Sequence, residues 1–180
     1  MSELIATSEE LCHECERLTT ITQDVQSTTI KAITRPIMEI VYADTTVKRP
    51  EYKTSGSSGM DVCAWLAEPV TIAPGERTLI PTGIRVSVEE GFELQVRPRS
   101  GLALTHGITV INSPGTIDAD FRGSIGIILI NLGTIPFTVN NGDRIAQLVL
   151  ARVEKAIIMD VNELSSTTRG EGGYGSTGVK

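Results

Sequence analysis

Two segments of the chain combine charged, hydroxyl and backbone donors in the way that phosphate binding requires. Arg97–Gly101 places two guanidinium groups, a serine hydroxyl and a turn with exposed N–H groups directly after an apolar strand. Arg169–Gly178 is a glycine-rich run whose N–H groups can approach an anion closely, with further donors from Arg169 and Ser176. Tyr174 within this run is suited to stacking on a flat ring. Taken alone, a strand-end turn and a disordered glycine-rich tail explain these segments at least as well.

A loop between two apolar strands carries groups that could bind a nucleoside and activate water. In Asn112–Gly123, the Asn112 amide can pair with the polar edge of a base, and Phe121 can pack against a sugar. Asp118 can orient and deprotonate a water molecule as a general base. The alternative is a hairpin whose aspartates bind the turn backbone.

Two further polar residues stand in surroundings that leave their roles open. Gln147 lies in the apolar run Ile145–Leu150 and needs a hydrogen-bond partner, which is either backbone or a bound phosphate. Asp61 follows the Ser/Gly-rich stretch Ser55–Gly59, where an aspartate is usually a turn residue. It could also hold a water of a hydrated Mg²⁺, which keeps most of its waters when it binds together with a nucleotide.

The elements that position these residues are predicted to be short strands, so the fold class is all-β. The expected strands are rich in β-branched residues and are separated by turn formers such as Pro74-Gly75 and Asn140–Gly142. They are Met38–Ala43, Arg77–Pro81, Ile84–Val88, Phe92–Val96, Gly107–Ile111, Ile125–Asn131, Pro136–Val139 and Ala146–Val153. Ile127–Ile130 is continuously apolar, which predicts burial on both faces. This number and spacing of strands indicate a β-sandwich or jelly roll.

The two ends differ from this core, which is expected over residues 31–164. Residues 1–30 hold no Gly or Pro, and Leu4, Leu11, Leu18 and Val25 recur every seven residues. A short amphipathic helix and a solvated arm are both compatible with this pattern. Residues 165–180 have almost no apolar content, so they are expected to form a flexible flap unless a ligand orders them.

Composition narrows the function classes. The net charge of −6 argues against non-specific nucleic-acid binding, which needs a basic face. The longest apolar run, near Ile125–Ile130, is too short to cross a membrane, and the N-terminus lacks the features of a signal peptide. The three cysteines are too few for a disulfide framework and fit a reducing cytoplasm. Cys12–Cys15 resembles half a zinc site, but His106 and Cys63 do not supply the second half.

The order and spacing of the five segments resemble the five motifs of the dUTPase family. S-G-M-D-V resembles the first motif, R-P-R-S-G-L-A the second and G-T-I-D-A-D-F-R-G the third. R-I-A-Q-L-V-L resembles the fourth motif, and R-G-E-G-G-Y-G-S-T-G the C-terminal fifth. The resemblance covers about residues 31–180, nearly the whole expected β domain.

This resemblance implies a jelly-roll subunit of the dUTPase-like β-clip type in a homotrimer, with a swapped C-terminal strand and tail. It implies Mg²⁺-dependent hydrolysis of dUTP to dUMP and diphosphate, which supplies dUMP for thymidylate synthesis and keeps uracil out of DNA. Three sites at subunit interfaces would each take motifs one, two and four from one chain. Motif three would come from a second chain and the flap from the third.

The resemblance also implies roles for individual residues. Asp118 would bind the sugar 3′-hydroxyl and polarise the attacking water, and Asp61 would contact Mg²⁺ through its waters. The residues that match phosphate-binding positions are Arg99, Ser100, Gly101 and Gln147. The residues that match uracil-reading positions are Asn112, Gly115, Thr116, Ile117 and Gly126. The flap would close the site with Arg169, Tyr174, Gly175 and Ser176.

Two departures from the family pattern and two competing functions complete the prediction. Phe121 stands where relatives commonly carry Tyr against the deoxyribose, so the ring is kept and the hydroxyl lost, and Tyr174 stands where Phe is commoner. A dCTP deaminase resembles this fold, but the complete glycine-rich tail and the I-D-A-D-F segment favour dUTPase. A non-catalytic jelly-roll module is disfavoured because every proposed catalytic group is present.

Overall fold

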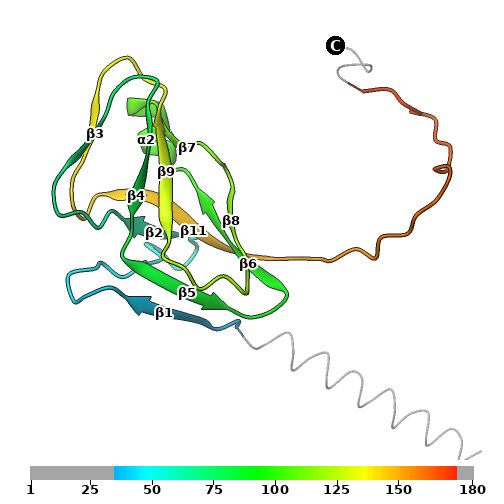
Figure 1. Ribbon diagram of the computed structural model, residues 1–180, viewed down its shortest axis with the longest axis horizontal. Helices are drawn as coiled ribbons and strands as arrows, with labels where there is room; N and C mark the ends of the chain where they lie inside the picture. Colours follow the sequence, from blue (N-terminus) through cyan, green and yellow to red (C-terminus); the bar gives the residue numbers. More distant parts are fainter. Residues whose placement is uncertain (1–34, 174–180) are drawn as a thin grey trace, which may run out of the picture.

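The computed structural model describes residues 35–173 as an all-β structure with one short helix (Figure 1). The strands of the first half are β1 Met38–Tyr42, β2 Met60–Cys63, β3 Val70–Ile72, β4 Arg77–Pro81, β5 Ile84–Val88 and β6 Phe92–Arg97. The remaining elements are α2 Ser100–His106, β7 Ile108–Val110, β8 Gly115–Ile117, β9 Gly126–Asn131, β10 Phe137–Val139 and β11 Arg144–Arg152. The expected arm at residues 1–30 lies outside the described residues, as do Tyr174, Gly175 and Ser176.

The strands form four antiparallel sheets. The largest has the order β2-β11-β6-β8, and a second has the order β4-β9-β7. Two pairs, β1-β5 and β10-β3, complete the arrangement. Because neighbours in each sheet come from distant parts of the sequence, the segments predicted to carry chemistry meet on shared sheets. Within residues 35–173 no helix has the length and apolar character needed to span a membrane.

Alternation of side chains builds one hydrophobic core from these sheets. On β5, Ile84, Val86 and Val88 are buried while Arg85 is exposed, as the period-two pattern predicts. The other fully buried side chains are also mostly β-branched or leucine, in keeping with a chain that has few aromatics: Ile72, Ile80, Leu94, Ile108, Ile127, Leu129, Ile145 and Leu148. The core thus fixes the relative positions of the sheets that carry the predicted site residues.

All eight predicted strands are present, and three details of the prediction are wrong. The segment Ile127–Ile130 is buried on one face of β9 only. Burial alternates along this strand, and Ile128 and Ile130 are half-buried. Ser100-Gly101 begins the helix α2 rather than a turn. The loop Asn112–Gly123 contains the strand β8, which pairs with β6.

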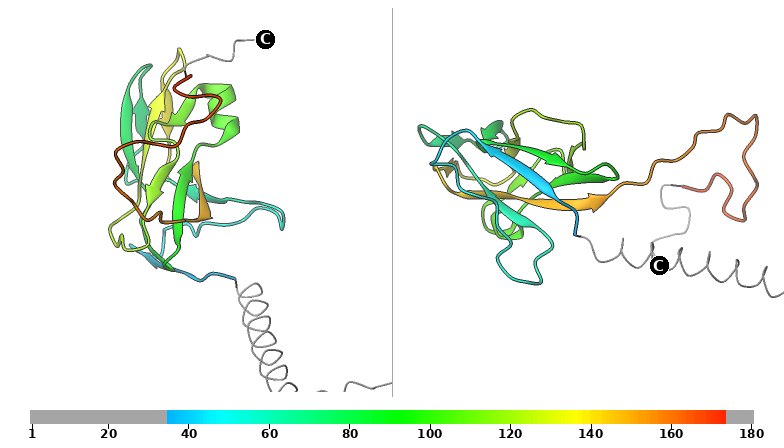
Figure 2. Two further views of the ribbon diagram at one scale, coloured as in Figure 1. Left: turned by 90° about the vertical axis from the view of Figure 1, so that its right-hand side faces the viewer. Right: turned by 90° about the horizontal axis from the view of Figure 1, so that it is seen from below.

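Beyond Val153 the chain leaves the sheets and runs outward as an extended segment, which we call the C-terminal arm (Figures 1 and 2). The arm carries bulky apolar side chains that are almost fully exposed: Ile157 at 91%, Ile158 at 89%, Met159 at 78% and Leu164 at 88%. Apolar surface of this kind on a single chain marks a site of contact with another surface.

Candidate active site

A buried carboxylate on β2 gathers three side chains from two other segments. Asp61 is only 6% exposed, and its Oδ2 accepts a hydrogen bond from Arg144 Nη1 at 2.8 Å. Its Oδ1 lies 3.4 Å from Arg99 Nε and accepts a hydrogen bond from Gln147 Nε2 at 3.3 Å. A buried carboxylate needs such partners because its charge is poorly solvated. The phosphate-binding candidates Arg99 and Gln147 are therefore held together, around Asp61.

The sheet register explains why these residues meet. Asp61 lies opposite Gln147 in the β2-β11 pair, and Gln147 lies opposite Arg97 in the β11-β6 pair. Arg99 follows two residues after Arg97, and its Nη1 donates a hydrogen bond to the Arg144 carbonyl oxygen at 3.0 Å. Gly59 allows the close approach of β2 and β11, since a Cβ there would lie 3.2 Å from Gln147 Cβ.

The helix α2 starts directly beside this cluster. Arg99 is the residue that precedes its first turn, and Ser100 and Gly101 are its first two residues, both exposed. First-turn N–H groups have no partner inside a helix, so they are available to an anion. Arg99, Ser100, Gly101 and Gln147 thus present guanidinium, hydroxyl, amide and backbone donors on one side of the sheet.

A second group of predicted residues lies on the segment between β7 and β9, which pair with each other. Within it, β8 brings Gly115 opposite Val96 and Thr116 opposite Gln95. A Cβ on Gly115 would lie 3.0 Å from Asn112 Nδ2, so the glycine leaves room for the Asn112 amide. Gly115 and Ile117 are buried, which anchors the segment, and Thr116 between them is exposed. Gly126 opens β9 opposite Pro81.

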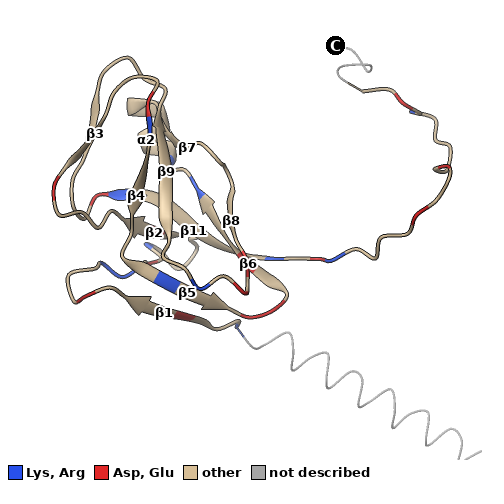
Figure 3. Cartoon of the chain, viewed as in Figure 1, with Lys and Arg blue, Asp and Glu red and all other residues tan. Residues whose placement is uncertain are grey.

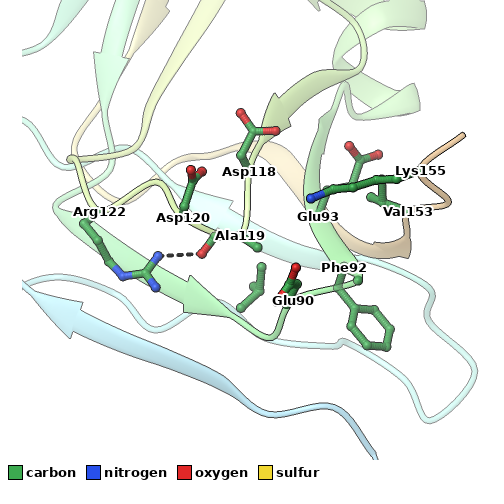
Figure 4. A pocket seen from close by; sticks show the side chains of 11 residues that line it. Glu90, Phe92, Glu93, Asp118, Ala119, Asp120, Arg122, Val153 and Lys155 are labelled. Atoms are coloured by element: carbon green, nitrogen blue, oxygen red, sulfur yellow. Dashed lines mark hydrogen bonds between the residues drawn. The ribbon is translucent and has the colours of Figure 1, made fainter. Parts of the chain in front are cut away.

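Asp118 follows β8 directly and lines a cleft of about 650 Å³ (Figure 4). Its carbonyl accepts a hydrogen bond from Phe121 N at 3.1 Å, and Arg122 Nη1 binds the carbonyl oxygens of Ala119 at 2.6 Å and Phe121 at 2.8 Å. Phe121 is 42% exposed and packs over Gly123, where a Cβ would lie 2.5 Å from the ring. Other side chains that line the cleft are Glu90, Phe92, Glu93, Asp120, Val153 and Lys155.

The two groups lie on the same face of the large sheet, at opposite ends. β8 ends with Ile117 opposite Leu94, so extending this register by one residue places Asp118 opposite Glu93 on β6. Gln147 pairs with Arg97, four residues further along β6. With ~4.8 Å between strands and ~3.3 Å per residue, Asp118 and Gln147 are roughly 16 Å apart. Between them, Gln95 donates to Glu93 Oε1 and accepts from Arg97, so hydrogen-bonded side chains occupy the intervening surface.

Charge differs between the two ends of β6. Basic residues lie where β6 ends and β11 begins, whereas both signs meet at the other end of β6 (Figure 3), where acidic residues line one cleft with Arg122 and Lys155. The first end therefore suits phosphate. Arg169 belongs to the exposed arm, which runs away from both groups, and its Nε donates to the Gly172 carbonyl at 2.8 Å.

The side chains of Arg99, Arg144 and Gln147 around Asp61 form what we call the phosphate cluster. Arg144 is its one member that was not predicted from the sequence. Arg144 and Gln147 are three residues apart, and such residues point to opposite faces of a regular strand. Their contact with one carboxylate depends on a register shift in β11, which no local pattern reveals. Cys63 lies opposite Arg144, and burial raises the pKa of its thiol, which lowers the share of the reactive thiolate.

This fold is a β-sandwich in which a cluster of guanidinium and amide donors suits a phosphorylated ligand and a separate cleft holds the exposed carboxylate of Asp118. Residues 45–178 match the family model for dUTPase. A deoxyuridine 5'-triphosphate nucleotidohydrolase of Treponema denticola is 58% identical over 130 residues, which cover 72% of this chain and 90% of that protein. The chain belongs to the dUTPase family, whose members are enzymes that hydrolyse dUTP.

Solved structures agree with this assignment. A Staphylococcus bacteriophage 80alpha dUTPase with dUPNHPP has a TM-score of 0.69 and 27% identity, covering 79% of this chain and 99% of that chain. A dUTPase variant from phage phi11 of S. aureus, described as coordinating a structural Mg(II) ion, has a TM-score of 0.65 and 23% identity. That match covers 72% of this chain and 99% of the phage chain and bears on the fold alone.

Proposed function

We propose that the protein hydrolyses dUTP to dUMP and diphosphate at sites that are each assembled from more than one chain. The observation that carries this proposal is the separation of roughly 16 Å between Asp118 and Gln147, estimated from strand spacing. An attacking water must lie ~3–3.5 Å from the α-phosphorus, and the side chains of Glu93, Gln95 and Arg97 fill the surface between the two groups. A carboxylate from one copy must therefore face the phosphate cluster of another.

Each part of the nucleotide has a proposed set of partners. Arg99, Ser100, Gly101 and Gln147 bind the phosphates. Asn112 and backbone groups of Gly115, Thr116, Ile117 and Gly126 read the uracil. Phe121 packs against the deoxyribose. The flap over residues 165–180 completes a neighbouring site with Arg169, Tyr174, Gly175 and Ser176.

Asp118 is the proposed catalytic base. It binds the 3′-hydroxyl and takes a proton from a water that attacks the α-phosphorus in line with the leaving diphosphate. Exposure of Asp118 within the cleft supports this role, because the water reaches it without opening the core. Arg99 and the first-turn N–H groups of α2 stabilise the negative charge that grows on the leaving diphosphate.

The residues fit a Mg²⁺ ion that arrives with the nucleotide. Among residues 35–173 no three acidic, histidine or cysteine side chains converge on a metal position, whereas the donors around Asp61 suit a polyphosphate. Asp61 is the proposed residue that contacts the waters of the ion. When bound, Mg²⁺ offsets the charge of the phosphate oxygens.

A homotrimer is the proposed assembly. The outer face of β4-β9-β7 leaves apolar side chains uncovered, with Leu79 at 62% and Ile111 at 45% exposure. Ile128 on the same sheet is half-buried, and the arm beyond Val153 exposes further apolar side chains. A symmetric assembly in which the C-terminal arm docks on a neighbour would bury both surfaces.

The three cysteines, with Cys63 a free thiol, support a cytoplasmic location.

Pyrophosphate release from dUTP, dCTP, dTTP and UTP, with and without Mg²⁺, tests the reaction. We expect release from dUTP alone, and loss of ~10²–10⁴-fold in kcat for Asp118→Asn, the range for removal of a general base. Asp120→Asn is the matched control, since Asp120 lines the same cleft two residues away. Ammonia released from dCTP, or an Asp118→Asn variant with full activity, would contradict the proposal.

A further inference from the structure

We infer that Arg144 is a positioning residue of the phosphate site. It forms the main ion pair with Asp61 and thereby leaves Arg99 and Gln147 available to bind a polyphosphate. This inference rests on the proposed phosphate role of Arg99 and Gln147. It concerns a residue outside the set matched to substrate or metal positions. Its basis is the backbone of β11 and the distances around one buried carboxylate.

The backbone of β11 aims Arg144 at Asp61. In the β2-β11 ladder, Gln147 lies opposite Asp61 and Ala146 opposite Val62, but the next paired residues are Arg144 and Cys63. Ile145 is therefore an extra residue, and it is buried together with Ala146. A bulge of this kind reverses the face on which the side chain beyond it lies, here that of the preceding residue Arg144. Without it, Arg144 would point away from the face that carries Gln147 and Asp61.

The three contacts to Asp61 are unequal. Arg144 Nη1 lies at 2.8 Å, the length of a charge-assisted hydrogen bond, and has Oδ2 as its acceptor. Arg99 Nε at 3.4 Å and Gln147 Nε2 at 3.3 Å both approach Oδ1 at longer distances. Arg144 is thus the main partner of the carboxylate, and the contacts of Arg99 and Gln147 to Asp61 are the longer ones, so a phosphate can replace them more easily.

Loss of Arg144 would change the competition between carboxylate and phosphate. Asp61 is 6% exposed, so bulk solvent compensates poorly for the missing partner. Its charge would then hold Arg99 and Gln147 more firmly, and a nucleotide would have to displace them at a higher cost. The effect falls on phosphate binding, because Asp61 contacts Arg99 and Gln147, which are proposed to bind the phosphates, whereas Asn112 and Asp118 are proposed to reach the site from another chain.

The test measures ligand binding by the full-length assembled protein in EDTA, so that any contact of Asp61 with Mg²⁺ does not contribute. Calorimetry with dUTP and NMR titration with deoxyuridine, which has no phosphate, compare wild type, Arg144→Gln and Arg144→Lys. Arg85→Gln is the matched control, since Arg85 is exposed on β5 of the separate β1-β5 pair. Removing one charge-assisted contact to a buried carboxylate predicts that Arg144→Gln weakens dUTP binding by roughly 10–100-fold and deoxyuridine binding by less than about twofold.

Two further comparisons separate positioning from general loss of structure. Lys cannot reproduce the planar guanidinium contact, so Arg144→Lys is expected to fall between wild type and Arg144→Gln. In the double variant Asp61→Asn, Arg144→Gln the competing charge is gone, and dUTP affinity is expected to rise above that of Arg144→Gln. Equal losses for dUTP and deoxyuridine, or no recovery in the double variant, would overturn the inference. A wild-type protein that binds dUTP in EDTA but releases no pyrophosphate with Mg²⁺ would overturn the proposed hydrolysis instead.

Discussion

Substitution of the buried Asn131 is expected to destabilise the protein more than substitution of any surface amide. Asn131 has no exposed surface, and its Nδ2 donates to the carbonyl oxygens of Ile72 at 2.9 Å and Ile135 at 2.8 Å. Its Oδ1 accepts a hydrogen bond from Gly133 N at 2.9 Å. Asn131→Ala leaves one fully buried and two partly buried groups without partners. At about 1–3 kcal/mol for the first and about 0.5–1.5 for each of the others, the loss is about 2–6 kcal/mol.

This loss is measurable by urea unfolding, because the chain has a single tryptophan, Trp65, as a fluorescence reporter. All variants are compared at one protein concentration, since assembly contributes to apparent stability. Asn140→Ala is the matched control, because Asn140 is exposed and its removal is expected to cost about 0.5 kcal/mol or less. An Asn131→Ala variant within about 1 kcal/mol of wild type would refute the reasoning, as that is less than one unmade buried hydrogen bond.

Three other substitutions or treatments have expected outcomes. A Cβ on Gly59 would lie 3.1 Å from Val149 Cγ2, so Gly59→Ala should displace β11. We expect this variant to raise the KM for dUTP more than it lowers kcat, and unchanged steady-state kinetics would contradict this. Gly107 has φ +69° and a Cβ there would lie 2.5 Å from Gly133 N, so Gly107→Ala should lower the Tm, and an unaltered melt by circular dichroism would argue against the contact. Burial raises the pKa of Cys63, so less thiolate is present at any given pH and iodoacetamide should modify it more slowly than a free cysteine peptide. Mass spectrometry of a Cys12→Ser, Cys15→Ser variant measures that rate, and equal rates would contradict the burial.

Hydrophobic pattern and turn residues sufficed to predict the longer strands. β4, β5, β6 and β9 are five or six residues long, alternate or are apolar, and are bounded by Gly or Pro turns. β3 and β8 have three residues each and were not predicted. They pair with β10 and β6, which lie elsewhere in the chain and supply their hydrogen bonds. The helix α2 has no buried residue and begins with Ser-Gly, so no amphipathic pattern marks it.

The site residues could be predicted from the sequence where a polar residue type is unusual for its position. Arg99, Gln147 and Asp118 were singled out as unusual polar residues beside apolar strands, and the order of their segments gave the family. Distances were not predictable, because the meeting of Asp61 with Gln147 and Arg99 depends on sheet register. Arg144 depends on a bulge at Ile145, which arises from packing of both Ile145 and Ala146 in the core.

Activity of mixed assemblies tests most directly whether each site is shared between chains. Asp118→Asn and Arg99→Gln chains with different affinity tags, each expected to be inactive alone, are co-expressed in equal amounts and isolated together. If a site takes Asp118 from one chain and Arg99 from the next, each mixed trimer has one of its three sites with both groups intact, and about one third of wild-type dUTP hydrolysis returns. If both groups act within one chain, no site contains an intact pair. Activity that stays at the level of the separate variants would then contradict the account.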